Sequence, residues 1–205
     1  MSVAGQIQHL IELGVPALAG RTSEEFAALG SGLPEEEDAL VVVHPSLVPA
    51  RVLAPLVRRG DKPGFVVVDM ADLDDFGDIA SVEVPEEPLY LVRDVDRGDD
   101  LRNWSPDEVY PELGQRQRSP MTISEGISWL LADPTQLEPN HCFMTIGTRK
   151  VKDAKGALDA RTPAIWISGG TGRDGKVNRQ APKIGWCWAG NRHTWLGFAS
   201  VGARG

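Results

Sequence analysis

The segment Lys183–Val201 reads KIGWCWAGNRHTWLGFASV and contains two runs of aromatic and aliphatic residues on either side of Gly190-Asn191. Glycine and asparagine both tolerate positive φ, which makes this dipeptide typical of a tight hairpin turn. The pattern predicts a β-hairpin with strands Lys183–Ala189 and Arg192–Val201. Two upstream runs, His141–Thr148 and Pro163–Ser168, also have the pattern of strands and would add to the same sheet. We therefore expect a mainly antiparallel sheet in this part of the chain.

Helical signals dominate before residue 139. Apolar residues at helical spacing over Gln6–Leu13 predict a first helix. Thr22 and Thr122 each stand three residues before a glutamate, the spacing of a capping box at a helix start. Ser105 precedes a proline, which favours another helix start there. Leu89–Val95 predicts one more strand.

The order strand, helix, strand over Ala39–His44, Pro49–Arg58 and Gly64–Asp69 predicts a βαβ unit with parallel strands. Pro55 interrupts the middle piece, because proline lacks a backbone donor. The expected fold class is α+β, with N-terminal helices and the βαβ unit packed on a C-terminal mainly antiparallel sheet. A chain of 205 residues suits a single domain, with an acidic portion at 1–139 and a basic portion at 140–205.

The formal net charge of −8 divides unevenly along the chain. Residues 1–139 contain 26 acidic and 10 basic residues, whereas residues 140–205 contain 3 acidic and 11 basic ones. Such asymmetry is typical of a protein that presents one surface to anions. The alternative is that the basic portion docks on the acidic portion of its own chain.

A two-residue hairpin loop would place Trp188 opposite His193 and Trp186 opposite Trp195, all on one face. Beside Arg192, this face would form a platform on which a base or another ring stacks. The alternative is that the tryptophans are packed core. The candidate ligand-binding residues are Trp186, Trp188, Trp195, His193, Arg192, Arg149, Lys150, Arg173, Lys176 and Arg179.

Gly170–Lys176 matches the spacing of a phosphate-binding loop as far as its lysine. Position 177 is valine, where such a loop requires a hydroxyl for magnesium, and no helix can begin there. We expect a flexible loop that contacts anions through its basic side chains, and no cofactor. The sequence Arg59-Gly60-Asp61 reads as a turn with no adhesion role.

An enzymatic alternative places a cysteine nucleophile beside a histidine base, with Cys187, His193, Cys142 and His141 as the candidates. The same residues raise the question of a zinc site. Adjacent strand residues point to opposite faces, and the paired Cys-x-x-Cys spacing is missing, so we expect no metal.

Two cysteines are too few for a disulfide framework, and Met1-Ser2-Val3-Ala4 does not begin a secretion signal. The longest apolar run, Ala39–Val43, is too short to cross a bilayer. The sequence therefore predicts a cytoplasmic protein with no membrane association.

Several stretches together resemble an uncharacterised actinobacterial family classed as a domain of unknown function. They are Leu10–Gly14, Pro16–Gly20, Asp94–Gly98, Pro163–Ser168 and, above all, Pro182–Asn191 with His193–Gly197. The resemblance spans nearly the whole chain and implies no activity, cofactor or catalytic residue.

The leading functional hypothesis is a non-enzymatic binding or regulatory protein whose basic C-terminal sheet engages a nucleic acid, a nucleotide or an acidic protein. The Cys/His enzyme and a structural homo-oligomer remain as alternatives.

Overall fold

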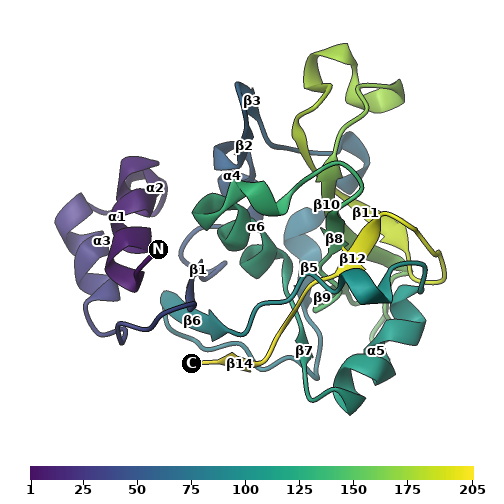
Figure 1. The fold of residues 1–205 in the computed structure, drawn as a ribbon, viewed down its shortest axis with the longest axis horizontal. Coiled ribbons are helices and arrows are strands. Elements are labelled where there is room, and N and C mark those ends of the chain that lie inside the picture. The colour runs from purple at the N-terminus through teal and green to yellow at the C-terminus, as the bar shows by residue number, and fades with distance from the viewer.

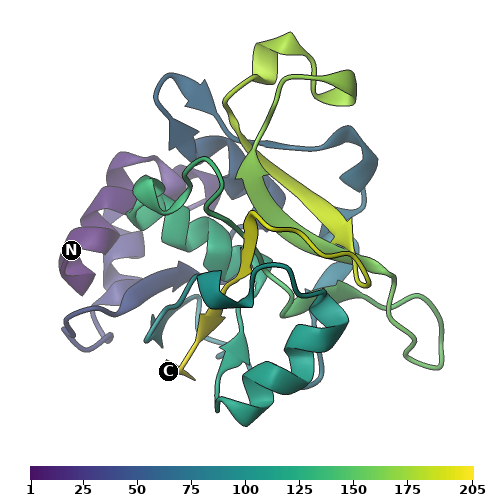
Figure 2. The same cartoon turned by 45° about the vertical axis from the view of Figure 1, so that its right-hand side comes forward.

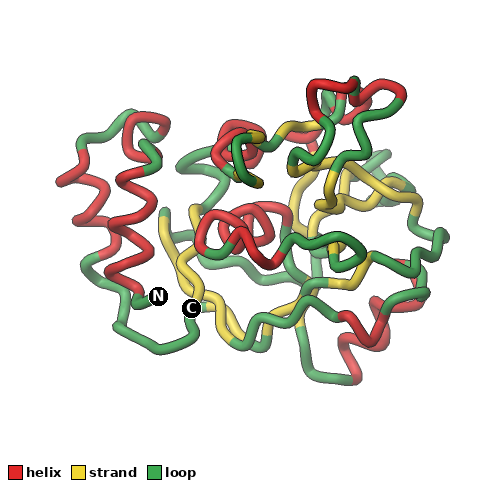
Figure 3. Tube along the Cα trace, turned by 45° about the horizontal axis from the view of Figure 1, so that its top comes forward, coloured by secondary structure: helices red, strands yellow, loops and turns green.

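The computed structural model describes residues 1–205 and contains six α-helices. They are α1 (Val3–Glu12), α2 (Val15–Leu18), α3 (Ser23–Gly30), α4 (Ala50–Leu53), α5 (Pro106–Gln115) and α6 (Ile123–Ala132). The longest helices have 10 residues, and none combines the length and hydropathy that a membrane crossing requires. Helices α1–α3 lie together at one side of the molecule (Figure 1, Figure 3).

The strands form two larger sheets and three short pairs. The five-stranded sheet has the order β12 (Leu196–Phe198), β8 (Cys142–Met144), β10 (Arg161–Ile167), β11 (Pro182–Trp188) and β4 (Phe65–Val66). The three-stranded sheet has the order β1 (Leu40–Val43), β6 (Leu89–Arg93) and β14 (Ala203–Arg204). The pairs are β2 (Arg58–Arg59) with β3 (Lys62–Pro63), β5 (Phe76–Asp78) with β9 (Thr148–Lys150), and β7 (Ser119–Pro120) with β13 (Ser200–Val201).

The predicted helix starts are confirmed by their capping hydrogen bonds. Thr122 accepts a bond from the Glu125 amide at 3.2 Å, and Glu125 accepts one from the Thr122 amide at 2.7 Å. Thr22 and Ser105 form the same reciprocal pattern at the starts of α3 and α5. Each box satisfies amides that the first helical turn leaves without a partner.

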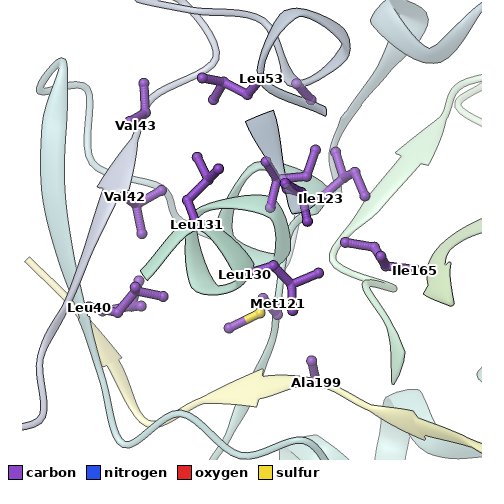
Figure 4. Close-up of a cluster of buried hydrophobic side chains, with 14 of the residues drawn as sticks. Leu40, Val42, Val43, Leu53, Met121, Ile123, Leu130, Leu131, Ile165 and Ala199 are labelled. Atoms are coloured by element: carbon purple, nitrogen blue, oxygen red, sulfur yellow. The ribbon is translucent and has the colours of Figure 1, made fainter. Parts of the chain in front are cut away.

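Helix α6 lies at the centre of the hydrophobic core. Side chains from β1, α4 and β10 surround it, among them Val42, Leu53 and Ile165 (Figure 4). The core is one cluster of 43 buried hydrophobic residues, drawn from both the acidic and the basic portion. The Ser128 hydroxyl of α6 accepts a bond from the Val43 amide at 3.2 Å, which ties the helix to β1.

The predicted βαβ unit is wrong. Strand β1 pairs antiparallel with β6, whereas β4 pairs parallel with β11 in the other sheet. The connection contains only the four-residue α4, a 3-10 turn over Ala54–Leu56 and the β2–β3 hairpin. A helix this short cannot cover a sheet as a parallel crossover requires, and Pro55 lies where the α-helix gives way to the tighter turn.

The predicted C-terminal hairpin is also wrong. Strand β11 pairs with β10 along its whole length, whereas β4 pairs with its other edge only at Lys183 and Ile184. The chain after Gly190-Asn191 instead reaches β8, with which β12 pairs in parallel. The other predicted strands correspond to β6, β8, β10 and β11. The fold is thus mixed α+β with mostly antiparallel sheets, as the sequence predicts.

Candidate anion-binding site

Most cations of residues 140–205 are engaged within the molecule. Six of them form ion pairs with carboxylates: Lys150, Arg161, Arg173, Lys183, Arg192 and Arg204. The partners include Asp72 and Asp75 for Lys150 and Glu108 for Arg192. Docking of the basic portion on the acidic portion, the alternative considered from the charge pattern, therefore accounts for much of the asymmetry.

Asp72 is the centre of the largest of these networks. Its carboxylate accepts bonds from Arg161 at 2.7 and 2.9 Å and from Lys150 at 2.9 Å. The Arg161 guanidinium also lies 5.2 Å from the centre of the Phe76 ring. The bonds from Arg161, and then that from Lys150, hold the pKa of the Asp72 carboxyl well below its ordinary value. Lys150 is committed to this network and is not available to a ligand.

Arg149 and Arg192 are likewise occupied. Arg149 is buried, and its Nε donates to the backbone oxygen of Asp159 at 3.2 Å. Arg192 pairs with Glu108, which also caps α5. Arg173 pairs with Asp69 at 3.3 Å but stays 76% exposed, so water and salt weaken this contact.

Among the candidate ligand-binding cations, Lys176 and Arg179 alone have side chains that form neither an ion pair nor a hydrogen bond. They lie with Arg59 and Lys62 around a surface depression of about 740 Å³, which we call the basic hollow. Gly60, Asp61 and Gln180 complete its lining, and no hydrophobic residue contributes. Arg59 and Lys62 form no ion pair either, so the hollow has four cations and one carboxylate.

Two segments far apart in sequence build the basic hollow. Strands β2 and β3 place Arg59 opposite Lys62, with Gly60 at a φ of 60° in the turn between them. The second segment is the loop between β10 and β11, which contains two 3-10 turns, η6 (Gly172–Asp174) and η7 (Lys176–Asn178), drawn in light green at the top of Figure 2. Nη1 of Arg59 donates to the side-chain oxygen of Gln180 at 2.8 Å, which joins the two segments.

The β10–β11 loop is held at its base by a polar cluster. The Ser168 hydroxyl donates to Asp174 at 2.8 Å, and the Gly170 amide donates to the Ser168 oxygen at 3.1 Å. Lys183 forms a largely buried ion pair with Asp174 at 2.9 Å. Asp174 therefore neutralises Lys183 at the base of the loop, while Lys176 and Arg179 remain free at the loop surface.

The predicted aromatic platform is divided between two faces. Strand β11 pairs Trp186 with Pro163 and Trp188 with Arg161, and these two tryptophans share a face with ring centres 4.5 Å apart. Lys183 and its partner Trp166 belong to the other face. The Trp195 ring lies 6.2 Å from Trp166 and 5.3 Å from His193. The platform fails because it depended on the hairpin that does not form.

Trp166 and Trp195 instead line a second cavity of about 410 Å³, which we call the aromatic pocket. Asn140, Cys142, Ser168 and Gln180 are among its other lining residues. Gln180 lines the basic hollow as well, so the two cavities adjoin.

The cysteine and histidine candidates do not form one centre. Burial raises the pKa of the Cys187 thiol to about 11 and also raises the pKa of Cys142, which opposes thiolate formation. No hydrogen bond joins either thiol to an imidazole: His141 lies 3.3 Å from Asp99, and Nε2 of His193 is buried without a partner. Burial lowers the pKa of His193. No group of three or more His, Cys, Asp or Glu residues has a geometry that could hold a metal ion.

Sequence reasoning found Lys176 and Arg179 but missed Arg59 and Lys62. The signal in the sequence is a glycine turn flanked by cations, Arg58–Lys62, of which we interpret only Arg59-Gly60-Asp61, as a turn with no adhesion role. Two basic turns are hard to associate when 114 positions separate Lys62 from Lys176 and nothing local joins them.

Fold and site together define an α+β protein with a basic hollow beside an aromatic pocket. The model of a family described as "Family of unknown function (DUF5701)" matches residues 9–205. The chain belongs to this family. Comparisons with curated proteins and with solved structures find no match.

Proposed function

We propose that this chain is a non-enzymatic binding protein that engages a phosphate-bearing ligand in the basic hollow. The observation that carries the proposal is a contrast in ion pairing among the cations of the chain. Six cations of residues 140–205 have carboxylate partners, whereas Arg59, Lys62, Lys176 and Arg179 converge from two segments without one. Like charges held together raise the local positive potential, which an anion relieves.

The chemistry of the hollow favours phosphate. Guanidinium groups such as that of Arg179 bind phosphate oxygens in a bidentate manner, and the lysine ammonium groups act as point charges. The side chains of the hollow come from two segments, so several oxygens of one compact anion can be contacted at once. A flat acidic protein surface would reach fewer of them.

Inorganic tripolyphosphate tests the proposal, because it has several phosphate charges and no ring. We expect binding by calorimetry at low ionic strength, with an affinity that falls steadily as salt is added. The double variant Lys176→Gln/Arg179→Gln should weaken binding by about tenfold or more.

The matched control is Lys152→Gln/Lys155→Gln, which removes the same charge. These two lysines are exposed and unpaired in the loop before β10, at the opposite end of the β10–β11 ladder from the basic hollow. The control should bind like the native protein. Absence of binding at low salt, or an equal loss in both double variants, would exclude a localised anion site.

A further inference from the structure

The basic hollow and the aromatic pocket meet at one residue. Gln180 has a φ of 69°, and its amide donates to the Ser168 backbone oxygen at 2.9 Å. Its side-chain oxygen accepts the bond from Arg59, and its side-chain NH₂ makes no hydrogen bond. A ligand that contacts both sides of Gln180 therefore extends from a cluster of cations to a cluster of indole rings.

Close packing holds the two indole rings of the aromatic pocket in place. Trp166 packs over Gly185, where an added Cβ would lie 2.5 Å from the indole, and Nζ of Lys183 lies 4.7 Å from the ring centre. The Trp195 ring meets Trp166 at 65° in an edge-to-face contact. Both indoles are half-buried, so each still presents surface to the pocket.

Polar groups stand beside the indoles. The Asn140 side chain makes no hydrogen bond within the protein, and neither does the side-chain NH₂ of Gln180. A heteroaromatic ring has a flat face for the indoles and a polar edge that can bond to these exposed amides, whereas an acyl chain offers them no hydrogen-bonding atom. The pocket is thus suited to a planar ring with nitrogen and oxygen atoms at its rim.

Building on the proposed function, we infer that the ligand is a nucleotide unit, with its phosphates in the basic hollow and its base in the aromatic pocket. A nucleotide joins phosphate and heteroaromatic ring within one short molecule, as the two adjoining cavities require. Indole surfaces accept any of the bases, because stacking depends on the flat π-face that all of them share. The same chemistry is offered by a free nucleotide and by a single nucleic-acid strand.

The test compares adenosine triphosphate, tripolyphosphate and adenosine by calorimetry, without divalent metal. We expect adenosine triphosphate to bind about tenfold more tightly than tripolyphosphate, and adenosine to bind weakly. Trp195→Leu should reduce the affinity for adenosine triphosphate to that for tripolyphosphate while leaving tripolyphosphate binding unchanged. Trp195→Phe, which keeps a stacking ring, should restore part of the difference.

The matched control is Trp188→Leu, which removes an indole from the opposite face of β11 and should change neither affinity. A hexanucleotide of deoxyadenosine distinguishes the two sources. Tighter binding than adenosine triphosphate, with a steeper salt dependence, would assign the site to a single strand, and weaker binding to a free nucleotide.

The two proposals can fail separately. Equal affinities for adenosine triphosphate and tripolyphosphate, unchanged by Trp195→Leu, would overturn the nucleotide inference and leave the anion site intact. If no phosphate compound binds at low salt, the proposed function itself is wrong.

Discussion

The guanidinium of Arg204 donates two hydrogen bonds to the carboxylate of Glu125, at 2.6 and 2.9 Å, in a contact closed to solvent. Glu125 also caps α6 and accepts a bond from the Tyr90 hydroxyl at 3.2 Å. One buried carboxylate thus joins β14, α6 and β6.

Arg204→Ala should destabilise the fold strongly, because it leaves the Glu125 charge buried without its partner. We expect a loss of about 3–5 kcal/mol in the free energy of unfolding, measured in urea. Arg93→Ala is the matched control, since Arg93 pairs with Glu36 where both side chains are about one-third exposed. Its cost should stay near 1 kcal/mol, at the upper end for surface pairs. Equal costs for the two variants would contradict the assigned role of Glu125.

Asp72→Asn should lower stability at neutral pH by about 1–3 kcal/mol, because it removes the charged acceptor of Arg161 and Lys150. The native pKa of Asp72 lies below the unfolded value of about 3.9, so its contribution is complete above that pH and is lost as the pH falls towards the native pKa. The difference in free energy of unfolding between Asp72→Asn and the native protein should therefore become smaller below about pH 4. Unfolding curves at pH 7 and pH 3 measure it. Glu86→Gln, at an exposed carboxylate without an ion pair, should show no such trend.

Both cysteines should react slowly with iodoacetamide at pH 7 in the folded protein. With a pKa of about 11, Cys187 has on the order of one thiolate in ten thousand, and Cys142 is buried with a raised pKa. Mass spectrometry should show rapid labelling of both only after denaturation. Rapid labelling of one native thiol would revive the enzymatic alternative.

Gly197→Ala should destabilise the fold, because an added Cβ would lie 2.3 Å from the backbone oxygen of Arg97. Two backbone segments meet there and neither can easily move, so the cost should be about 1–3 kcal/mol. Gly190→Ala is the control within the same segment, since no atom lies within 4 Å of the added methyl group. Thermal unfolding of both variants compares them, and a neutral Gly197→Ala would show that this close approach is not required.

The helices could be predicted from sequence because their signals are local. A hydroxyl at the N-cap and a glutamate three residues later contact each other within one turn, wherever the helix later packs. The partners of the strands could not be predicted in the same way. Gly190-Asn191 is a sound turn signal, yet it does not show that the chain after the turn pairs in parallel with β8 and that β10 pairs along the whole of β11.

The candidate site was partly predictable for the same reason. The cationic loop at Lys176 and Arg179 is visible as composition, but the carboxylates that remove Lys150 and Arg192 from the candidates lie far away in sequence. Arg59 and Lys62 join the site only because β4 pairs with β11 and brings the preceding hairpin towards the β10–β11 loop.

The path of residues 196–204 determines when the protein can complete its folding during synthesis. This short segment contributes β12 to the five-stranded sheet, β13 to a pair with β7, and β14 to the three-stranded sheet. Until residues 196–204 have left the ribosome, the edges of β6 and β8 that they cover have no paired strand. The buried carboxylate of Glu125 also lacks its ion-pair partner, Arg204. Folding of the body of this protein is therefore completed after these residues are synthesised, and the nascent chain before that point is the form that most needs protection from aggregation.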